Sequence, residues 1–190
     1  MRELASLPSL LVEPIVRAAL VEDLGRAGDI TTTAVVSREA RFSGAMVARQ
    51  PGTIAGTDAA LIAFGLVDPT LDISILQPDG SVVEAGQPVI YIEGPAGAVV
   101  TAERTALNFI CHLSGIATVT AQLVAGVGNN KARITCTRKT TPNLRALEKH
   151  AVRAGGGVSH RFGLDDGILI KDNHVALAGG IRPAIQSAKV

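Results

Sequence analysis

Aromatic residues are scarce in this 190-residue sequence, which contains no tryptophan, one tyrosine and four phenylalanines. The hydrophobic core must therefore be built mainly from alanine, valine, leucine and isoleucine, and the chain is long enough to bury one. Charged residues make up 18% and hydrophobic residues 47% of the sequence, as is usual for a globular protein. Twenty glycines and nine prolines indicate many turns and argue against a helical bundle.

Cysteines and long apolar segments are also few. Cys111 and Cys136 lack the CxxC spacing of a zinc or redox motif and cannot build a disulfide framework, which favours a reducing compartment. The N-terminus lacks the apolar stretch of a signal peptide, and the apolar runs are shorter than the roughly 20 residues that span a bilayer. We therefore expect a cytoplasmic protein that does not cross a membrane.

The first hundred residues predict a small α+β sheet domain. Its expected elements are a helix over 9–24 with Pro14 in its first turn, strands over 43–50 and 71–77, a short helix over 58–64 between them, and short strands within 81–95.

The pattern changes from Thr101 onward, where helices and strands alternate. Such alternation is typical of parallel βα units, as in a barrel. Only two or three units fit before Val190, too few to close a barrel, so we expect an incomplete barrel and a truncated chain. The expected elements are a helix over 101–128 that breaks at Ser114-Gly115, a strand over 133–136, a helix ended by the glycines at 155–157, a buried strand over 167–171, and a helix from 181.

Charge is unevenly distributed, with a net charge of −6 over residues 1–130 and +6 over residues 131–171. Arg145, Lys149 and Arg153 are four residues apart, which predicts one exposed helix face. The other cations of interest lie in loops or at strand ends: Arg138, Lys139, His160, Arg161 and Lys171. Functional groups of βα units gather at the carboxyl ends of strands, so we expect these loops to hold a ligand with two or more carboxylates or phosphates.

Other polar residues are expected to be structural. Asp29 is interpreted as a helix cap or turn residue, His112 as a structural residue and His150 as a helix-surface residue. Each loop cation taken alone is as often a solvated basic residue, and only their coincidence in three loops indicates a site. Nothing in the local pattern singles out Arg104.

Four motifs resemble the quinolinate phosphoribosyltransferase family and together cover essentially the whole chain in order. They are EDLGRAGDITT from residue 22, TAERTALNFICHLSGIAT at 101–118, TRKTTPNLRALEKHAVRAGGG at 137–157 and HRFGLDDGILIKDNH at 160–174. The resemblance implies an α/β (α+β) chain with two domains. An N-terminal α/β sandwich would span residues 1–105, and the first part of an open, incomplete α/β barrel would span residues 106–190.

The resemblance also implies a reaction and roles for individual residues. The reaction would transfer the phosphoribosyl group of 5-phosphoribosyl-1-pyrophosphate to quinolinate with Mg²⁺, giving nicotinate mononucleotide, CO₂ and pyrophosphate in NAD biosynthesis. The two carboxylates of quinolinate would be contacted by Arg138, His160, Arg161 and Lys171. Lys139 would contact the phosphoribosyl donor, and Arg104 would reach into the active site of a neighbouring subunit. Lys139 and Lys171 would be the catalytic residues, and a homodimer or larger homo-oligomer is implied.

Two positions depart from the family pattern. Cys136 stands where an Asp usually precedes the TRKT run, and a thiol orients a neighbouring cation less well than a carboxylate does. Ser159 stands where an Asn usually precedes the His-Arg pair. The acidic residues that bind magnesium in the family would lie beyond Val190, so the metal ligands stay unknown.

Other functions remain open at this stage. A related phosphoribosyltransferase-like protein with another substrate would share the fold. The glycine-rich strands at 79–97 resemble a biotinyl or lipoyl carrier module, but no lysine occurs before Lys131 to carry the cofactor. Nucleic-acid binding is disfavoured because Phe162 is the only aromatic residue within 131–171, leaving no stacking platform.

Overall fold

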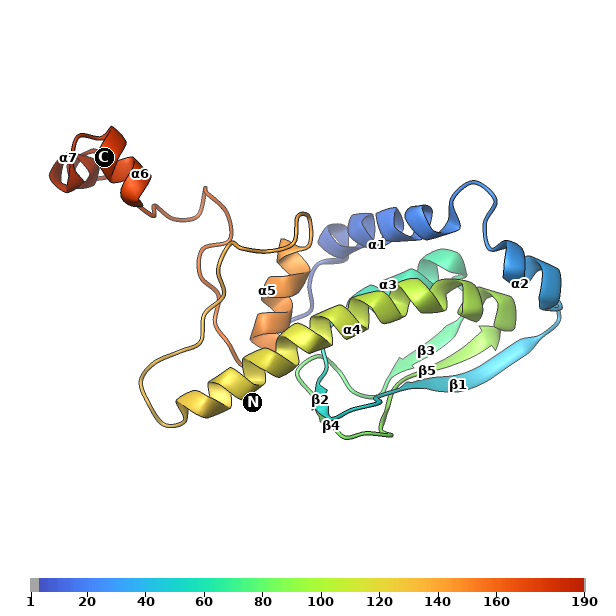
Figure 1. The fold of residues 1–190 in the computed structure, drawn as a ribbon. Coiled ribbons are helices and arrows are strands. Elements are labelled where there is room, and N and C mark those ends of the chain that lie inside the picture. Colours follow the sequence, from blue (N-terminus) through green and yellow to red (C-terminus); the bar gives the residue numbers. More distant parts are fainter. Residues whose placement is uncertain (1–3, 190) are drawn as a thin grey trace. The chain divides into compact units, whose positions relative to one another are not determined.

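The computed structural model describes residues 4–189 and divides into two compact units, Met1–Ser159 and His160–Val190. The first unit contains helices α1 to α5 and strands β1 to β5, and the second contains α6 and α7 (Figure 1). The mixture of helices and strands confirms the α/β (α+β) class, and residues 4–189 contain no closed barrel.

A three-stranded antiparallel sheet forms one layer of the first unit, in the order β1-β5-β3. Its strands are β1 (Arg41–Val47), β5 (Pro88–Pro95) and β3 (Asp72–Ile75). The central strand β5 is apolar and largely buried, whereas the edge strand β1 alternates between exposed and partly buried residues. This alternation is the pattern of a strand with one face toward the core.

Two further strands, β2 (Gly52–Thr53) and β4 (Val82–Val83), form a separate antiparallel pair beside the main sheet. The strands expected over 43–50, 71–77 and within 81–95 are therefore confirmed, although each is shorter than its pattern.

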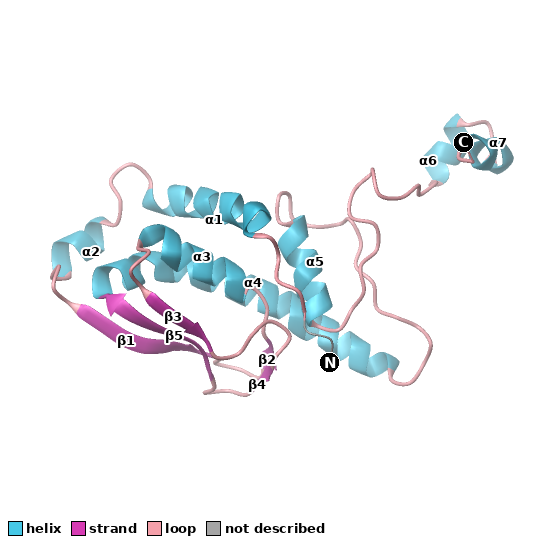
Figure 2. Cartoon of the chain, turned by 180° about the vertical axis from the view of Figure 1, so that it is seen from behind, coloured by secondary structure: helices cyan, strands magenta, loops and turns pink. Residues whose placement is uncertain are grey.

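Helices cover one face of the main sheet (Figures 1 and 2). The long helix α4 (Ala96–Val127) contacts β1 and β5, and α3 (Thr57–Val67) packs along α4. Helix α1 (Ser9–Leu24) packs on α3 and α4, so the unit is built in layers around one core. The short helix α2 (Ile30–Val35) follows α1 and was not expected from the sequence.

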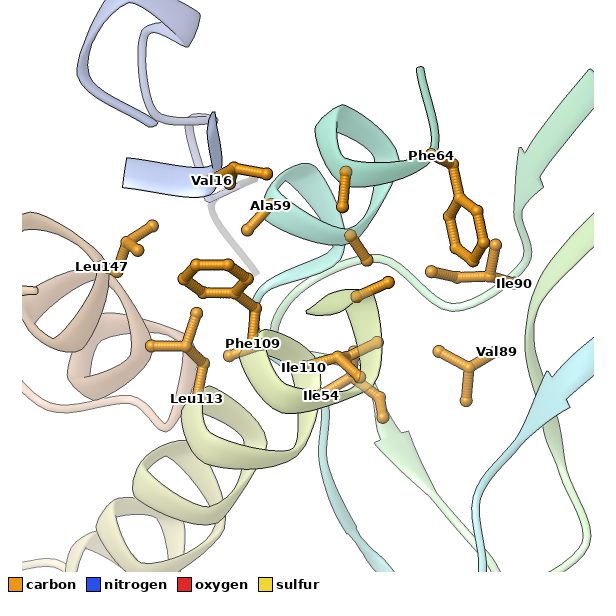
Figure 3. Packing of buried hydrophobic residues seen from close by; sticks show 14 of the residues in the cluster. Val16, Ile54, Ala59, Phe64, Val89, Ile90, Phe109, Ile110, Leu113 and Leu147 are labelled. Atoms are coloured by element: carbon orange, nitrogen blue, oxygen red, sulfur yellow. The ribbon is translucent and has the colours of Figure 1, made fainter. Parts of the chain in front are cut away.

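The core lies between these helices and the sheet, and it is built from aliphatic side chains as the composition requires. Phe64 of α3, Ile90 of β5 and Leu113 of α4 are among its fully buried members. Phe64 points toward Ile90, and Phe109 fills the space near Val16 of α1 (Figure 3). Removing a buried side chain as large as Phe64 typically costs about 3–5 kcal/mol of stability.

Helix α1 has the predicted bounds. It follows Pro8 and ends at Gly25, whose φ of 54° lies in the left-handed region that glycine adopts readily. Pro14 is the sixth residue of the helix, so its expected place in the first turn was wrong. Asp29 is confirmed as a helix cap: it precedes α2, and its Oδ1 accepts a hydrogen bond from the Thr32 backbone N at 2.8 Å.

Helix α4 runs without the break expected at Ser114-Gly115. The Ser114 hydroxyl bonds to Ala55 of the β2–α3 connection, accepting from its N–H at 3.0 Å and donating to its carbonyl at 3.2 Å. The serine therefore joins α4 to the sheet side and does not compete with the helix backbone. The division predicted between residues 105 and 106 falls inside this continuous helix and stays a prediction.

By length and composition α4 could also cross a membrane, against the sequence expectation. Its buried residues, however, form the centre of the core, where Ala106, Ile110 and Leu113 are at most 7% exposed. One such helix is weak evidence for a membrane span, because a core helix has the same length and composition.

Residues 131–171, which carry the net positive charge, begin after α4 and include α5 (Arg145–Ala154), which packs on α4. The close approach of the two helices depends on Gly155 at the end of α5. A Cβ atom at this position would collide with the Ala117 carbonyl oxygen and lie 2.7 Å from Thr120 Cβ. The glycine run was expected only as a helix stop, and it also permits helix packing.

The second unit is small and contains α6 (Asp172–Leu177) and α7 (Ile181–Ser187). The helix expected from residue 181 is confirmed, and α6 was missed. The buried strand expected over 167–171 was wrong: these residues form no strand, and Ile168 is 75% exposed. A strand is stabilised by a hydrogen-bonded neighbour, and residues 160–189 provide none for this apolar run.

Candidate functional site

The loop that carries Arg138 and Lys139 starts from one parallel β-bridge. Thr135 pairs with Val158, whose N–H donates to the Ile134 carbonyl at 2.9 Å and whose carbonyl accepts from the Cys136 N–H at 3.2 Å. The strand expected over 133–136 is therefore reduced to a single bridge. This bridge fixes the backbone directly before the loop.

Three consecutive titratable residues of α5 are buried, which the sequence analysis did not foresee. Glu148, Lys149 and His150 are 9%, 4% and 5% exposed. The expected exposed stripe of Arg145, Lys149 and Arg153 was thus wrong for Lys149, and the surface placement of His150 was wrong. Each of the three buried side chains contacts a different segment, which compensates the cost of burying a polar group.

Glu148 and Lys149 hold the two ends of the loop. Lys149 Nζ donates to Cys136 Sγ at 2.9 Å, before the loop, and Glu148 Oε2 accepts from the Thr141 backbone N at 3.2 Å, after it. The other Glu148 oxygen bonds to His112 Nε2 of α4 at 3.0 Å, a contact that agrees with the structural role expected for His112. Helix α5 therefore braces residues 137–140 from both sides.

The electrostatics of Glu148 favour its charged form. Burial alone would raise the pKa of this carboxyl, but hydrogen bonds from Thr141 and His112 outweigh burial and lower the pKa. A carboxylate that accepts several hydrogen bonds stays ionised and keeps its partners in place.

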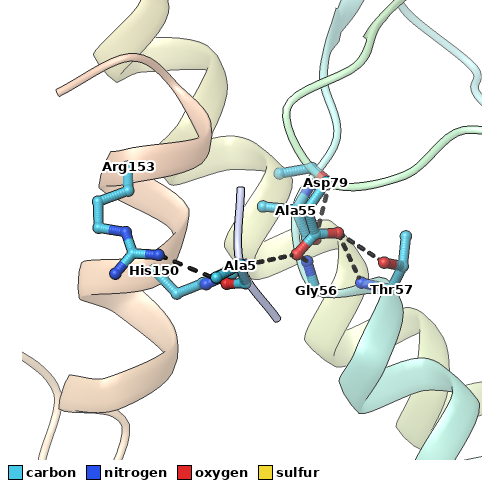
Figure 4. Close-up of polar contacts among 8 residues, drawn as sticks. Ala5, Ala55, Gly56, Thr57, Asp79, His150 and Arg153 are labelled. Carbon is cyan, nitrogen blue, oxygen red and sulfur yellow. Dashed lines mark hydrogen bonds and ion pairs between the residues drawn. The ribbon is translucent and has the colours of Figure 1, made fainter. Parts of the chain in front are cut away.

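His150 connects α5 to the sheet side of the first unit through Asp79. His150 Nε2 lies 2.9 Å from Asp79 Oδ2, and the same carboxylate accepts from the backbone N of Gly56 at 2.9 Å and of Thr57 at 3.0 Å (Figure 4). Burial would raise the pKa of Asp79, yet the bonds from His150, Gly56 and Thr57 lower it overall. This network ties α5 to the start of α3.

Gly56, the residue before α3, suits this position for two reasons. Its φ of 96° is left-handed, and a Cβ atom there would lie 2.7 Å from Leu113 Cδ1. The resulting close approach of α3 and α4 brings both backbone N–H groups to Asp79.

Within the loop, Arg138 lacks a partner among the described residues. Its Nε is buried and makes no hydrogen bond there, and no carboxylate of residues 4–189 forms an ion pair with it. Lys139 is exposed, and its backbone N–H donates to Thr137 Oγ1 at 3.0 Å. The loop thus presents two cations, one of them partly buried and without a counter-charge.

The other residues predicted to contact a carboxylate lie in the second unit, where several hydrogen bonds join near neighbours. The exposed His160 accepts at Nδ1 from the Arg161 N–H at 2.7 Å, and Arg161 Nη1 donates to the Gly167 carbonyl at 2.8 Å. Arg161 Nε, like that of Arg138, is buried without a partner in the described chain. Lys171 is exposed just before α6, and its N–H donates to His174 Nδ1 at 2.9 Å.

The structure thus brings Arg138 and Lys139 together on one loop, and it brings His160 and Arg161 together in a turn of the second unit. Arg104 is an exposed residue of α4. Convergence of the three loops on one ligand stays a prediction. The bracing residues Glu148, Lys149 and Asp79 were missed, and the only available signal was a charged triplet flanked by the apolar Leu147 and Ala151.

Three cavities of the first unit, of about 370, 470 and 300 Å³, are lined by none of the predicted cations. A cavity of about 370 Å³ is lined by Glu22, Asp23 and His112 among others, and its two carboxylates disfavour an anionic ligand. No group of three His, Cys, Asp or Glu residues suited to a metal ion occurs within residues 4–189.

Comparison with protein-family models gives two matches that lie in chain order. Residues 29–114 match "Quinolinate phosphoribosyl transferase, N-terminal domain", and residues 116–190 match "Quinolinate phosphoribosyl transferase, C-terminal domain".

Curated relatives and solved structures agree with these matches. The chain is 48% identical to the nicotinate-nucleotide pyrophosphorylase [carboxylating] of Mycobacterium leprae over 92% of its own length and 62% of the relative. It is 40% identical to the probable enzyme of the same name from Bacillus subtilis, covering 95% of this chain and 62% of that one. The structure of NadC from Streptococcus pyogenes superimposes with a TM-score of 0.92 at 38% identity, covering 97% of this chain and 65% of NadC. The chain thus spans about three fifths of the length of these curated relatives.

Proposed function

Because this chain belongs to the quinolinate phosphoribosyltransferase family, we propose that it contributes the quinolinate-binding part of an enzyme that makes nicotinate mononucleotide. The reaction joins quinolinate to 5-phosphoribosyl-1-pyrophosphate and releases CO₂ and pyrophosphate, a step of NAD biosynthesis. The enzyme is a decarboxylating pentosyltransferase.

The main support for this proposal is the buried Nε of Arg138, which has no hydrogen-bond partner within residues 4–189. A guanidinium with a buried Nε and no partner in the described chain is costly unless an anion pairs with it. Quinolinate has carboxylates on adjacent ring carbons, and an arginine fork matches a carboxylate in a bidentate geometry. We assign one carboxylate contact to Arg138 and the other contacts to His160, Arg161 and Lys171.

The chemistry requires orientation and charge stabilisation more than proton transfer. Cations on both carboxylates fix the ring so that its nitrogen faces the anomeric carbon of the sugar. Loss of pyrophosphate develops oxocarbenium character on the sugar, and Lys139 stabilises the charge on the leaving phosphates as a mobile cation.

Decarboxylation follows from the product of the first step. The ribosylated ring nitrogen carries a formal positive charge and accepts the electrons left when the adjacent carboxylate departs as CO₂. Lys171, assigned to a carboxylate, acts by holding that group in position. No protein general base is assigned for this step.

Magnesium belongs to the proposal as the counter-ion of the diphosphate donor. Mg²⁺ is commonly held by substrate phosphates with only one or two carboxylates from the protein. Because residues 4–189 contain no three-residue metal group, we assign it no ligand and derive no step through it.

The proposed oligomer is a homodimer or larger assembly in which Arg104 reaches a neighbouring subunit. Arg104 is an exposed residue of α4, and within residues 4–189 its side chain makes no hydrogen bond or ion pair. The proposed location is the cytoplasm, where NAD precursors and reduced thiols coexist. Mixing Arg104→Ala and Arg138→Ala chains should restore about a quarter of the quinolinate sites if subunits share them. Sites confined within one subunit would give no restoration.

The principal test is calorimetric titration of the chain with quinolinate and with nicotinate, which lacks the second carboxylate. We expect quinolinate to bind at least about tenfold more tightly than nicotinate. Nicotinate lacks the second carboxylate and would therefore leave one cation of the site unpaired. Arg138→Ala should weaken quinolinate binding by about 2–4 kcal/mol, roughly 30- to 1,000-fold.

Arg38→Ala is the matched control, because Arg38 is an exposed arginine in the turn before β1. It should change the affinity by less than about twofold. Equal affinity for nicotinate and quinolinate would favour a related phosphoribosyltransferase-like protein with another substrate. Absence of binding by the folded chain would contradict the assignment of the quinolinate site to these residues.

A further inference from the structure

We propose that Cys136 and Lys149 form an oxidative cross-link site, in which a hydroperoxide oxidises the thiol and the lysine amine then bonds to sulfur. This inference does not rest on the proposed enzymatic activity. It follows from the contact between the two side chains and from the different elements that hold them.

The two reacting atoms are already adjacent. Lys149 Nζ lies 2.9 Å from Cys136 Sγ, and the Lys149 residue is only 4% exposed. Lys149 is fixed in the middle of α5, whereas the Cys136 backbone is fixed by its bond to Val158. Because each atom is positioned by its own element, the reaction between them is effectively unimolecular and strongly favoured.

The sulfur of the pair is more accessible to solvent than the amine, as oxidation of the sulfur first requires. Cys136 is partly exposed, so a small peroxide can reach its sulfur. The amine lies deeper and faces the sulfur from the protein side. An oxidised sulfur therefore meets the lysine at once, before it meets a second oxidant molecule or a bulkier thiol.

The other cysteine provides an internal comparison. Cys111 is exposed on α4, and within residues 4–189 its thiol makes no hydrogen bond to an amine. Both cysteines see the same oxidant in the same sample, so a cross-link at Cys136 alone would be due to its neighbour.

The reaction has two balanced steps. In the first, the Cys136 thiolate attacks hydrogen peroxide, the O–O bond breaks, and sulfur is oxidised to a sulfenic acid while hydroxide leaves. In the second, the neutral Lys149 amine attacks that sulfur, an S–N bond forms, the S–O bond breaks, and the amine proton leaves with the hydroxyl as water. One thiol, one amine and one peroxide thus give one sulfenamide and two waters.

The test is mass spectrometry of the intact chain after treatment with hydrogen peroxide at mildly alkaline pH. We expect a product about 2 Da lighter than the reduced chain, because two hydrogens are lost and no oxygen is kept. Proteolysis should yield one species that contains the Cys136 and Lys149 peptides joined, and dithiothreitol should release them.

Three variants separate the cross-link from ordinary oxidation. Lys149→Arg keeps a cation but removes the nucleophilic amine, so the mass should rise by about 16 or 32 Da and Cys136 should be trapped by dimedone. Cys136→Asp keeps a partner for the lysine and should give no cross-link. Cys111→Ser should leave the cross-link unchanged.

The peptide map of the unmodified chain decides the question even if a variant fails to fold. A dimedone adduct or a sulfinic acid on Cys136, with Lys149 recovered free, would overturn the proposal. So would a cross-link formed equally well through Cys111.

Discussion

The loop of Arg138 and Lys139 and the segment of His160 and Arg161 are assigned to the same ligand, but they are fixed by different kinds of contact. The first is braced by buried side chains of α5. Lys149 bonds to Cys136 just before the loop, and Glu148 bonds to Thr141 just after it. The second includes bonds between near neighbours on a largely exposed segment, such as Arg161 Nη1 to the Gly167 carbonyl. Only Ala184 is a buried hydrophobic residue among those described in the second unit.

This difference indicates that only the Arg138 loop is fixed in its binding geometry by the folded chain itself. Polar contacts from the buried Glu148 and Lys149 of α5 fix the Arg138 loop before any ligand arrives, and such preorganisation improves affinity. The segment of His160 and Arg161 is largely exposed and its unit buries little apolar surface, so local opening should cost little free energy and a ligand can rearrange it. Variants of the two regions should therefore differ in their effect on stability.

The largest effect on stability is expected from Asp79→Asn. The carboxylate pairs with His150 and accepts bonds from Gly56 and Thr57, and losing one member of a buried charged network costs about 2–4 kcal/mol. Urea unfolding at neutral pH should show this decrease in the free energy of unfolding. Asp72→Asn, at an exposed position of β3, is the control and should change it by less than about 0.5 kcal/mol. Equal effects of the two variants would contradict a bracing role for Asp79.

A smaller effect is expected from Glu148→Gln. Glutamine keeps the shape and can still accept from the Thr141 N–H, but the charge that faces His112 is lost. We expect about 1–2 kcal/mol less stability and weaker quinolinate binding, since the end of the Arg138 loop is less firmly held. Glu84→Gln, an exposed change, should alter neither quantity. A loss of stability with quinolinate affinity unchanged would show that this contact does not position the loop.

The elements of the first unit could be predicted from local sequence to different degrees. Helix α1 was predicted with the correct bounds, because backbone chemistry acts at short range. The burial of Lys149 and His150 could not be predicted from local sequence. Their spacing matches an exposed helix face, and only the tertiary positions of Cys136 and Asp79 make burial favourable.

The same limit explains the reduced strand over 133–136 and the wrong strand over 167–171. Both segments have the composition of strands, but a strand also needs a hydrogen-bonded neighbour. The first finds one bridge to Val158, and residues 160–189 offer no neighbour to the second. Five candidate cations were predicted from their places in loops and at strand ends, and only Arg104 came from a family motif. The buried, unpaired Nε of Arg138 could be seen only in the structure.

Acid should weaken the braced region through Asp79 and Glu148, whose pKa values are both lowered in the folded chain. A folded-state pKa below the unfolded one means that the unfolded chain binds more protons, so unfolding becomes easier as pH falls. The stabilisation should be complete above about pH 4.5 and should be lost as the pH falls through the folded pKa values. Urea midpoints between about pH 2.5 and 5 should fall less steeply in Asp79→Asn than in the unmodified chain. Parallel slopes would mean that Asp79 does not contribute to this acid sensitivity.

The smallest effect is expected in the locally bonded region, from Asp166→Asn. Asp166 accepts from the N–H groups of Phe162 and Gly163, and these bonds lower the pKa of its carboxyl. Because the turn is exposed and its bonds join near neighbours, the urea midpoint of the first unit should not change. Faster amide hydrogen exchange at Phe162 and Gly163 is the expected local result, since both lose an acceptor of full charge. If the variant instead lowered the urea midpoint as much as Glu148→Gln does, the two regions would share one cooperative unit, and their separate modes of fixation would have to be abandoned.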